Sequence, residues 1–150
     1  MSEKTDTVDP DRFALPARLE RKLGEVHSYW QGLKRGQADI PFADDVKLAP
    51  LGRLAANVLL LDVFEGPQRF RFGIVGEAVP NSYGTNLEGQ FVDEVPSTFP
   101  LDELPNQCRV TTLTRAPTYY DGGTELRRLL LPLWGDGHIS MILGAIVTTR

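Results

Sequence analysis

The chain has 150 residues, with 16 Lys and Arg against 20 Asp and Glu, a formal net charge of -4 and one cysteine. This length suits one domain with one core, and the negative charge opposes binding to nucleic-acid phosphates or anionic lipid. One cysteine excludes an intramolecular disulfide and a cysteine-based zinc cluster. The sequence has no signal-peptide pattern and no apolar run of about 20 residues, so it predicts a soluble, cytoplasmic protein without membrane contact.

The first 55 residues are predicted to precede the main domain. Residues 1–12 are polar and aperiodic, so we expect a disordered arm. Pro16 suits a first helical turn, and Gly36 suits a helix end. A broken connector with a short helical turn follows. Residues 13–55 are therefore expected to form an N-terminal helical extension and connector.

One apolar stripe runs along this predicted helix. Its members recur at steps of four, three, four and three residues: Leu19, Leu23, Val26, Trp30 and Leu33. Two interpretations remain open. The stripe packs on its own domain, or it pairs with a second copy to form a homodimer in which Trp30 is the anchor.

The remaining residues, 56–150, are expected to form an α+β domain. Residues 57–64 and 69–76 are rich in β-formers and are joined by a short turn, which predicts a hairpin. Residues 77–90 are rich in turn formers, and we expect Gly84 or Gly89 to adopt a positive φ. Residues 101–115 have a helical pattern, and residues 118–150 read as three strands separated by "DGG" and "GDG" turns.

Several short segments resemble the PAS superfamily of sensor domains, and in particular a bacterial family of short stand-alone PAS proteins. They are Trp30, "ADIP" (residues 38–41), "LLLDVF" (59–64), "RFRFGIVG" (69–76) and "YGTNLEGQ" (83–90). The resemblance covers about residues 26–148. It implies a five-stranded antiparallel sheet with helices packed on one face and a ligand-sized space between them.

The segment "RFRFGIVG" could form either a nucleic-acid-binding surface or the lining of a pocket or core. Strict alternation places Phe70, Phe72 and Ile74 on one face of a strand, while Arg69 and Arg71 share the other. An RNA-recognition strand would need a different signature and a second exposed aromatic strand in a basic sheet. The aromatic residues are therefore expected to face a pocket or core, and no nucleic-acid partner is predicted.

We expect the odd-numbered face of the last strand to lie opposite the aromatic face of residues 69–76 in this pocket. Tyrosine and cysteine would supply the few polar atoms that an apolar pocket uses to orient a ligand. The candidate ligand-binding residues are Phe72, Ile74, Tyr83, Cys108, Tyr119, Leu131, Met141 and Leu143. An ordinary core formed by the same residues is the alternative.

No catalytic or metal-binding constellation stands out. Cys108 would need a nearby base to act as a nucleophile, and neither His27 nor His138 has the spacing of a partner or of a metal site. Residues 77–115 lack a histidine that could ligate haem. The stretch "PNQCRVTT" (residues 105–112) departs from the flavin-photosensor pattern. The sequence therefore argues against an enzyme, haem and flavin, and leaves any other cofactor open.

The sequence thus predicts a single-domain sensory or signalling module that binds a small ligand or an effector protein and has no catalytic output of its own. Two alternatives remain. The first is a structural interaction or dimerisation module with a filled core, and the second is a small enzyme that uses the PAS cavity.

Overall fold

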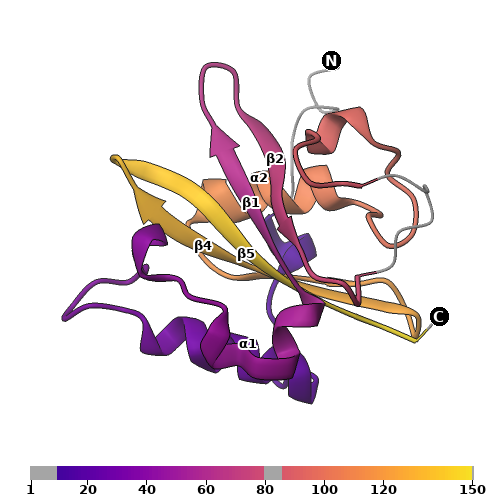
Figure 1. The fold of residues 1–150 in the computed structure, drawn as a ribbon, viewed down its shortest axis with the longest axis horizontal. Helices are drawn as coiled ribbons and strands as arrows, with labels where there is room; N and C mark the ends of the chain where they lie inside the picture. The colour runs from indigo at the N-terminus through magenta and orange to yellow at the C-terminus, as the bar shows by residue number, and fades with distance from the viewer. Residues whose placement is uncertain (1–9, 80–85, 150) are drawn as a thin grey trace.

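The computed structural model describes residues 10–79 and 86–149, which form an α+β fold around an open five-stranded antiparallel sheet (Figure 1). The strand order is β2-β1-β5-β4-β3. The strands are β1 (Val58–Phe64), β2 (Arg69–Val75), β3 (Thr118–Asp121), β4 (Leu126–Gly135) and β5 (His138–Thr148). The β1–β2 hairpin and the β3–β4–β5 meander agree with the strands and turns expected from the sequence.

Two α-helices lie on opposite faces of this sheet, as Figure 1 shows for α1 (Arg21–Gly32) and α2 (Leu104–Thr114). The expectation of helices on one face therefore describes α2, whereas the N-terminal extension covers the other face through α1. Short 3₁₀ helices complete the order: η2 (Pro10–Phe13), η3 (Ala43–Asp45), η4 (Ala49–Asn57) and η5 (Val92–Glu94). The predicted arm, residues 1–12, overlaps η2, and residues 1–9 lie outside the described part.

The sheet separates two hydrophobic cores. The α1-side core contains Leu23, Val26, Trp30, Leu51, Val58, Leu60, Leu129, Leu131, Leu133, Leu143 and Ala145. The α2-side core contains, among others, Leu59, Leu61, Phe70, Phe72, Leu104, Cys108, Leu130, Ile142 and Ile146. Successive side chains of a strand point to opposite faces. Because both faces of β1, β4 and β5 are buried, these strands carry apolar residues at consecutive positions.

Helix α1 begins later than the sequence suggested. Its N-cap is Glu20, whose side-chain Oε1 accepts hydrogen bonds from the backbone N–H groups of Lys22 at 2.7 Å and Leu23 at 3.2 Å. These two bonds satisfy N–H groups that have no partner within the helix. Pro16 therefore lies outside the first turn, and Leu19 precedes the helix.

The buried part of the predicted apolar stripe packs on its own chain. Leu23, Val26 and Trp30 are at most 2 % exposed, and all three belong to the α1-side core. Trp30 also donates a hydrogen bond from Nε1 to the Pro132 carbonyl on β4, at 2.9 Å. These side chains leave no free surface for a second copy, so the assignment of Trp30 as a dimer anchor is wrong.

The substitution Val26→Glu tests this placement. Because Val26 is buried against the sheet, the new carboxylate would be desolvated, and we expect a loss of about 3 kcal/mol or more in the free energy of unfolding. Gln31→Glu, on the exposed face of the same helix, adds the same charge and should change stability by less than about 0.5 kcal/mol. Urea denaturation measures both. A Val26→Glu protein of wild-type stability that had merely dissociated from a dimer would contradict the intrachain packing.

The turn after β2 contains the expected positive φ. Gly89 has φ 91°, its N–H donates to the Phe72 carbonyl at 2.7 Å, and the Phe72 N–H donates to the Gln90 carbonyl at 2.9 Å. The turn thus returns the chain to the outer edge of β2. Gly84 and Tyr83 lie outside the described residues, so the prediction of one positive φ at Gly84 or Gly89 is confirmed by Gly89 alone.

Gly89→Val should lower the free energy of unfolding by about 1–3 kcal/mol, through backbone strain. A Cβ at this position would meet no heavy atom within 4 Å, so the cost comes from the backbone conformation and not from a clash. Gly89→Asn is the matched variant, since asparagine tolerates a positive φ better than valine does. Equal melting temperatures for the two variants would show that the conformation at residue 89 imposes no such cost.

Candidate functional site

A β-bulge in β2 separates two of the predicted pocket residues. In the β1–β2 pairing, Phe72 lies opposite Leu61 while Ile74 lies opposite Leu60. Two residues of β2 therefore span one residue of β1, and Gly73 is the extra residue. Since Leu60 and Leu61 point to opposite faces, so do Phe72 and Ile74. Phe72 is buried in the α2-side core, whereas Ile74 is 43 % exposed, so their predicted common face is wrong.

The β5 residues that share a face with Phe72 also differ from those predicted. Leu143 pairs with Leu60 and belongs to the α1-side core, and Met141 pairs with Asp62 and packs against that same core. The residue of β5 that shares the core of Phe72 is Ile142. Met141 and Leu143 thus lie across the sheet from Phe72. Both faces of β5 are apolar, so alternation alone could not decide which of them faced α2.

The described candidates therefore fall into two groups and do not line one cavity. Phe72 and Cys108 belong to the α2-side core, Leu131 and Leu143 belong to the α1-side core, and Tyr119 and Met141 pack against the α1-side core. Tyr83 lies outside the described residues.

A buried arginine is the most unusual group in the α2-side interior. Arg128 on β4 is 0 % exposed. Its guanidinium donates from Nε to Gln107 Oε1 at 2.8 Å, from Nη1 to the Pro100 carbonyl at 3.0 Å and from Nη2 to the Asp102 carbonyl at 2.7 Å. Its Cζ also lies 4.9 Å from the centroid of the Tyr120 ring. These contacts connect β4 to α2, to the segment before α2 and to β3.

Neutral oxygens hold this cation. No carboxylate in residues 10–79 or 86–149 accepts a hydrogen bond from Arg128, and burial lowers the pKa of its guanidinium to about 10. The Gln107 amide is held in turn, because its Nε2 donates to Thr118 Oγ1 at 3.1 Å and to the Arg128 carbonyl at 3.2 Å. The polar cluster is thus rigidly connected, but its charge is not neutralised by a direct ion pair.

Cys108 follows Gln107 on α2 and is fully buried. Burial raises the pKa of its thiol to about 12, and the nearby positive charge of Arg128 only partly offsets this shift. The thiolate is the reactive form of cysteine, so the Cys108 side chain at neutral pH is a small apolar core group.

The sequence around Arg128 carries a local signal for its burial. Leu126, Arg128 and Leu130 alternate on β4, and both leucines are in the α2-side core. A residue between two inward positions of the same phase points inward as well. The arginine was therefore predictable as an inward-facing residue, but its partners on α2 and before it are distant in sequence.

Arg128→Lys should lower the free energy of unfolding by about 3 kcal/mol, because a lysine cannot serve three acceptors in the geometry of a guanidinium and leaves buried groups unpaired. Arg127→Lys is the control at the neighbouring, partly exposed position, where we expect a change within about 0.5 kcal/mol. Guanidinium chloride denaturation gives both values. Equal stability of the two variants would show that the fork geometry at Arg128 is dispensable.

The arginines of "RFRFGIVG" are paired with acids on the surface. Arg69 lies 2.7 Å from Asp93, and its guanidinium lies over the Phe91 ring. Arg71 lies 3.1 Å from Asp62. The ion pair with Arg69 lowers the pKa of the Asp93 carboxyl. These pairs neutralise the strand's positive charge, so this surface offers no basic stripe for a nucleic acid.

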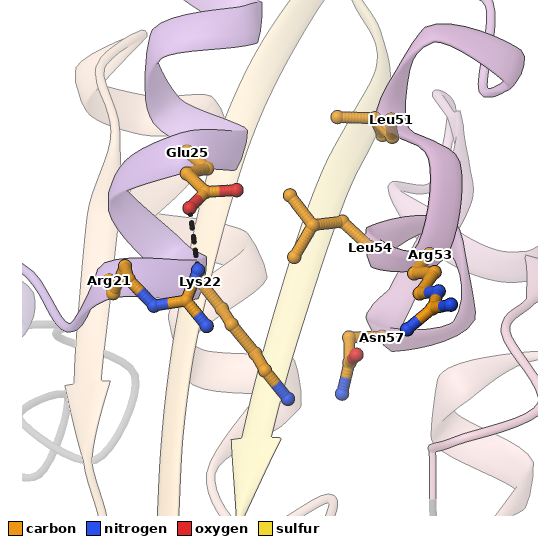
Figure 2. A pocket seen from close by; sticks show the side chains of 7 residues that line it. All are labelled: Arg21, Lys22, Glu25, Leu51, Arg53, Leu54 and Asn57. Carbon is orange, nitrogen blue, oxygen red and sulfur yellow. Dashed lines mark hydrogen bonds and ion pairs between the residues drawn. The ribbon is translucent and has the colours of Figure 1, made fainter.

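Among the surface pockets lined by described residues, one adjoins α2 and another adjoins α1. The α2 pocket, of about 400 Å³, is lined by Ser97, Asp102, Glu103, Pro105, Asn106 and Tyr120. The α1 pocket, of about 470 Å³, is lined by Arg21, Lys22, Glu25, Leu51, Arg53, Leu54 and Asn57, and Figure 2 shows it between α1 and η4. Neither pocket was predicted from the sequence, since each joins residues from separate elements.

One lining residue of the α2 pocket, Asp102, carries an unpaired buried acceptor. Asp102 Oδ1 is buried without a hydrogen-bond partner, while the carbonyl of the same residue accepts from Arg128 Nη2. Glu103, by contrast, accepts from Asn106 at 3.0 Å and pairs with Arg12 at 3.1 Å, contacts that lower the pKa of its carboxyl. The pocket thus adjoins the Arg128 cluster, and one of its lining residues carries a buried oxygen without a partner.

Within the described ranges, no three His, Cys, Asp or Glu side chains group as a metal site. No helix of the described part is long and apolar enough to cross a membrane. No protein-family model, curated protein or solved structure matches the chain.

Proposed function

We propose that this chain is a PAS-like sensory module that responds to a small ligand or an effector protein on the α2 side of its sheet and has no catalytic output of its own. The observation that carries the proposal is the Arg128 guanidinium, which is fully buried and held by neutral oxygens. The antiparallel sheet with α2 and η5 on one face also supports it, because the PAS resemblance implies that arrangement.

A buried cation without a carboxylate partner costs free energy, and a well-packed apolar residue of similar volume often serves stability as well or better. Arg128 instead joins three segments through charge-assisted bonds, which are about twice as strong as neutral ones. A displacement of α2 or of the 100–102 segment would have to break or rearrange these bonds. The cluster therefore couples the position of α2 to the sheet.

The α2 pocket is the proposed site of the signal. Asp102 lines this pocket, its buried Oδ1 has no hydrogen-bond partner and its carbonyl accepts from Arg128. A ligand that moves the Asp102 side chain and donates a hydrogen bond to Oδ1 would therefore also act on the cluster. Tyr120 contributes a ring that contacts both the pocket and Arg128. We expect a small molecule with a hydrogen-bond donor.

A filled-core interaction module is the second candidate. Phe72 and Cys108 are fully buried, and neither belongs to the wall of the α1 or the α2 pocket. Such packing supports a core made for stability, with the signal carried by a partner protein. The third class, an enzyme, has less support, because the raised pKa of the Cys108 thiol leaves almost no thiolate at neutral pH.

Native mass spectrometry of freshly purified protein, followed by a melting-temperature screen of small molecules, tests the proposal. We expect a retained small molecule, or a ligand that raises the melting temperature and slows amide exchange in α2. Arg128→Lys should abolish that response, and Arg127→Lys should retain it. An apo mass with no ligand-induced shift would instead favour the filled-core module, and turnover in a substrate screen would favour an enzyme.

A further inference from the structure

The α1 pocket gathers positive charge on the side of the sheet opposite α2. Its volume of about 470 Å³ lies in the range of small-molecule sites, about 300–1,000 Å³. Of its four charged side chains, Arg21 pairs with Glu25 at 2.9 Å. That pair leaves the pocket with two further cations, although the chain as a whole carries a net charge of -4.

These two cations are Lys22 and Arg53, and neither forms an ion pair with another described residue. They come from different elements, because Lys22 is in the first turn of α1 and Arg53 is in η4. In Figure 2 the Lys22 side chain extends from α1 into the opening between α1 and η4, and Arg53 and Asn57 come from η4 on the other side. An anion between them would relieve the unpaired positive charge of both elements.

Two leucines add an apolar surface to the lining of this pocket. Leu51 and Leu54 project from η4 toward α1 in Figure 2, and Leu51 is 8 % exposed. The amides at the start of α1 are already occupied, since Glu20 Oε1 accepts from the N–H groups of Lys22 and Leu23. Side chains, and not the helix amides, are therefore the groups available to an anion.

We propose that the α1 pocket binds a small organic acid. Its carboxylate lies between Lys22 and Arg53, where a guanidinium can bind both oxygens, and its apolar body packs on Leu51 and Leu54. A bare phosphate would use the charges and leave the leucines without a partner. The bound acid connects α1 to η4, so it holds α1 against the segment that leads into β1.

Benzoate is the probe, titrated into the full chain by isothermal calorimetry at an ionic strength of about 10 mM, where the Debye length is about 30 Å. We expect saturable binding, with benzamide, the uncharged analogue, binding at least tenfold more weakly. Lys22→Gln and Arg53→Gln should each raise the Kd for benzoate at least fivefold. Arg18→Gln, an exposed position that does not line the pocket, removes the same charge and should leave the Kd within twofold.

Four results would overturn the proposal: no saturable benzoate binding, equal binding of benzamide, tighter binding of inorganic phosphate, or equal affinity in the Lys22 and Arg53 variants. Melting temperatures without ligand separate lost binding from lost folding, and Arg53→Lys, which keeps the charge, should recover part of the affinity. Arg128 does not line this pocket, so Arg128→Lys should leave the Kd for benzoate within twofold, and failure of one proposal is distinguishable from failure of the other.

Discussion

Burial of both faces of the sheet is the constraint on which the rest of the structure depends. In β1, Leu59 and Leu61 point toward α2 while Leu60 points toward α1. Consecutive positions from Val58 to Leu61 must therefore suit an interior, whereas Phe64 at the end of the strand is 38 % exposed. Each fully buried side chain of this size contributes roughly 1.5–3 kcal/mol. A single-layer sheet with one wet face would not require α1, whereas this sheet would expose the whole α1-side core without it.

The same constraint explains how far the sequence could predict the fold. The strands were predicted from local signals, namely turn residues at 122–123 and 135–137 and the β-rich runs beside them. The helical pattern of residues 101–115 likewise predicted α2. Which face of β4 and β5 points toward α2 was not predicted, because apolar residues at consecutive positions remove the alternation on which such predictions rest. The bulge at Gly73 then turned the Ile74 side chain to the face opposite Phe72. The bulge and the lost alternation both led to predicted pocket residues that lie on the wrong side of the sheet.

The polar features depended on contacts between distant segments. Arg128 could be placed inward from its leucine neighbours, but its acceptors come from residues 100, 102 and 107. Likewise, Lys22 and Arg53 lie at one opening only because α1 and η4 pack side by side over the sheet. No spacing in a single sequence encodes such pairs, whereas the apolar stripe of α1 is encoded locally, and only its partner had to be determined.

The two faces of the sheet are joined by packing through its central strands. Arg128 belongs to β4, whose neighbouring Leu129 and Leu131 pack in the α1-side core with Trp30. Trp30 is further fixed to β4 by its bond to the Pro132 carbonyl. Because packed interiors resist continuous deformation, a change in the position of α2 that moves β4 must also be accommodated by α1. Packing of the central strands, and not a free helix stripe, therefore joins the two faces.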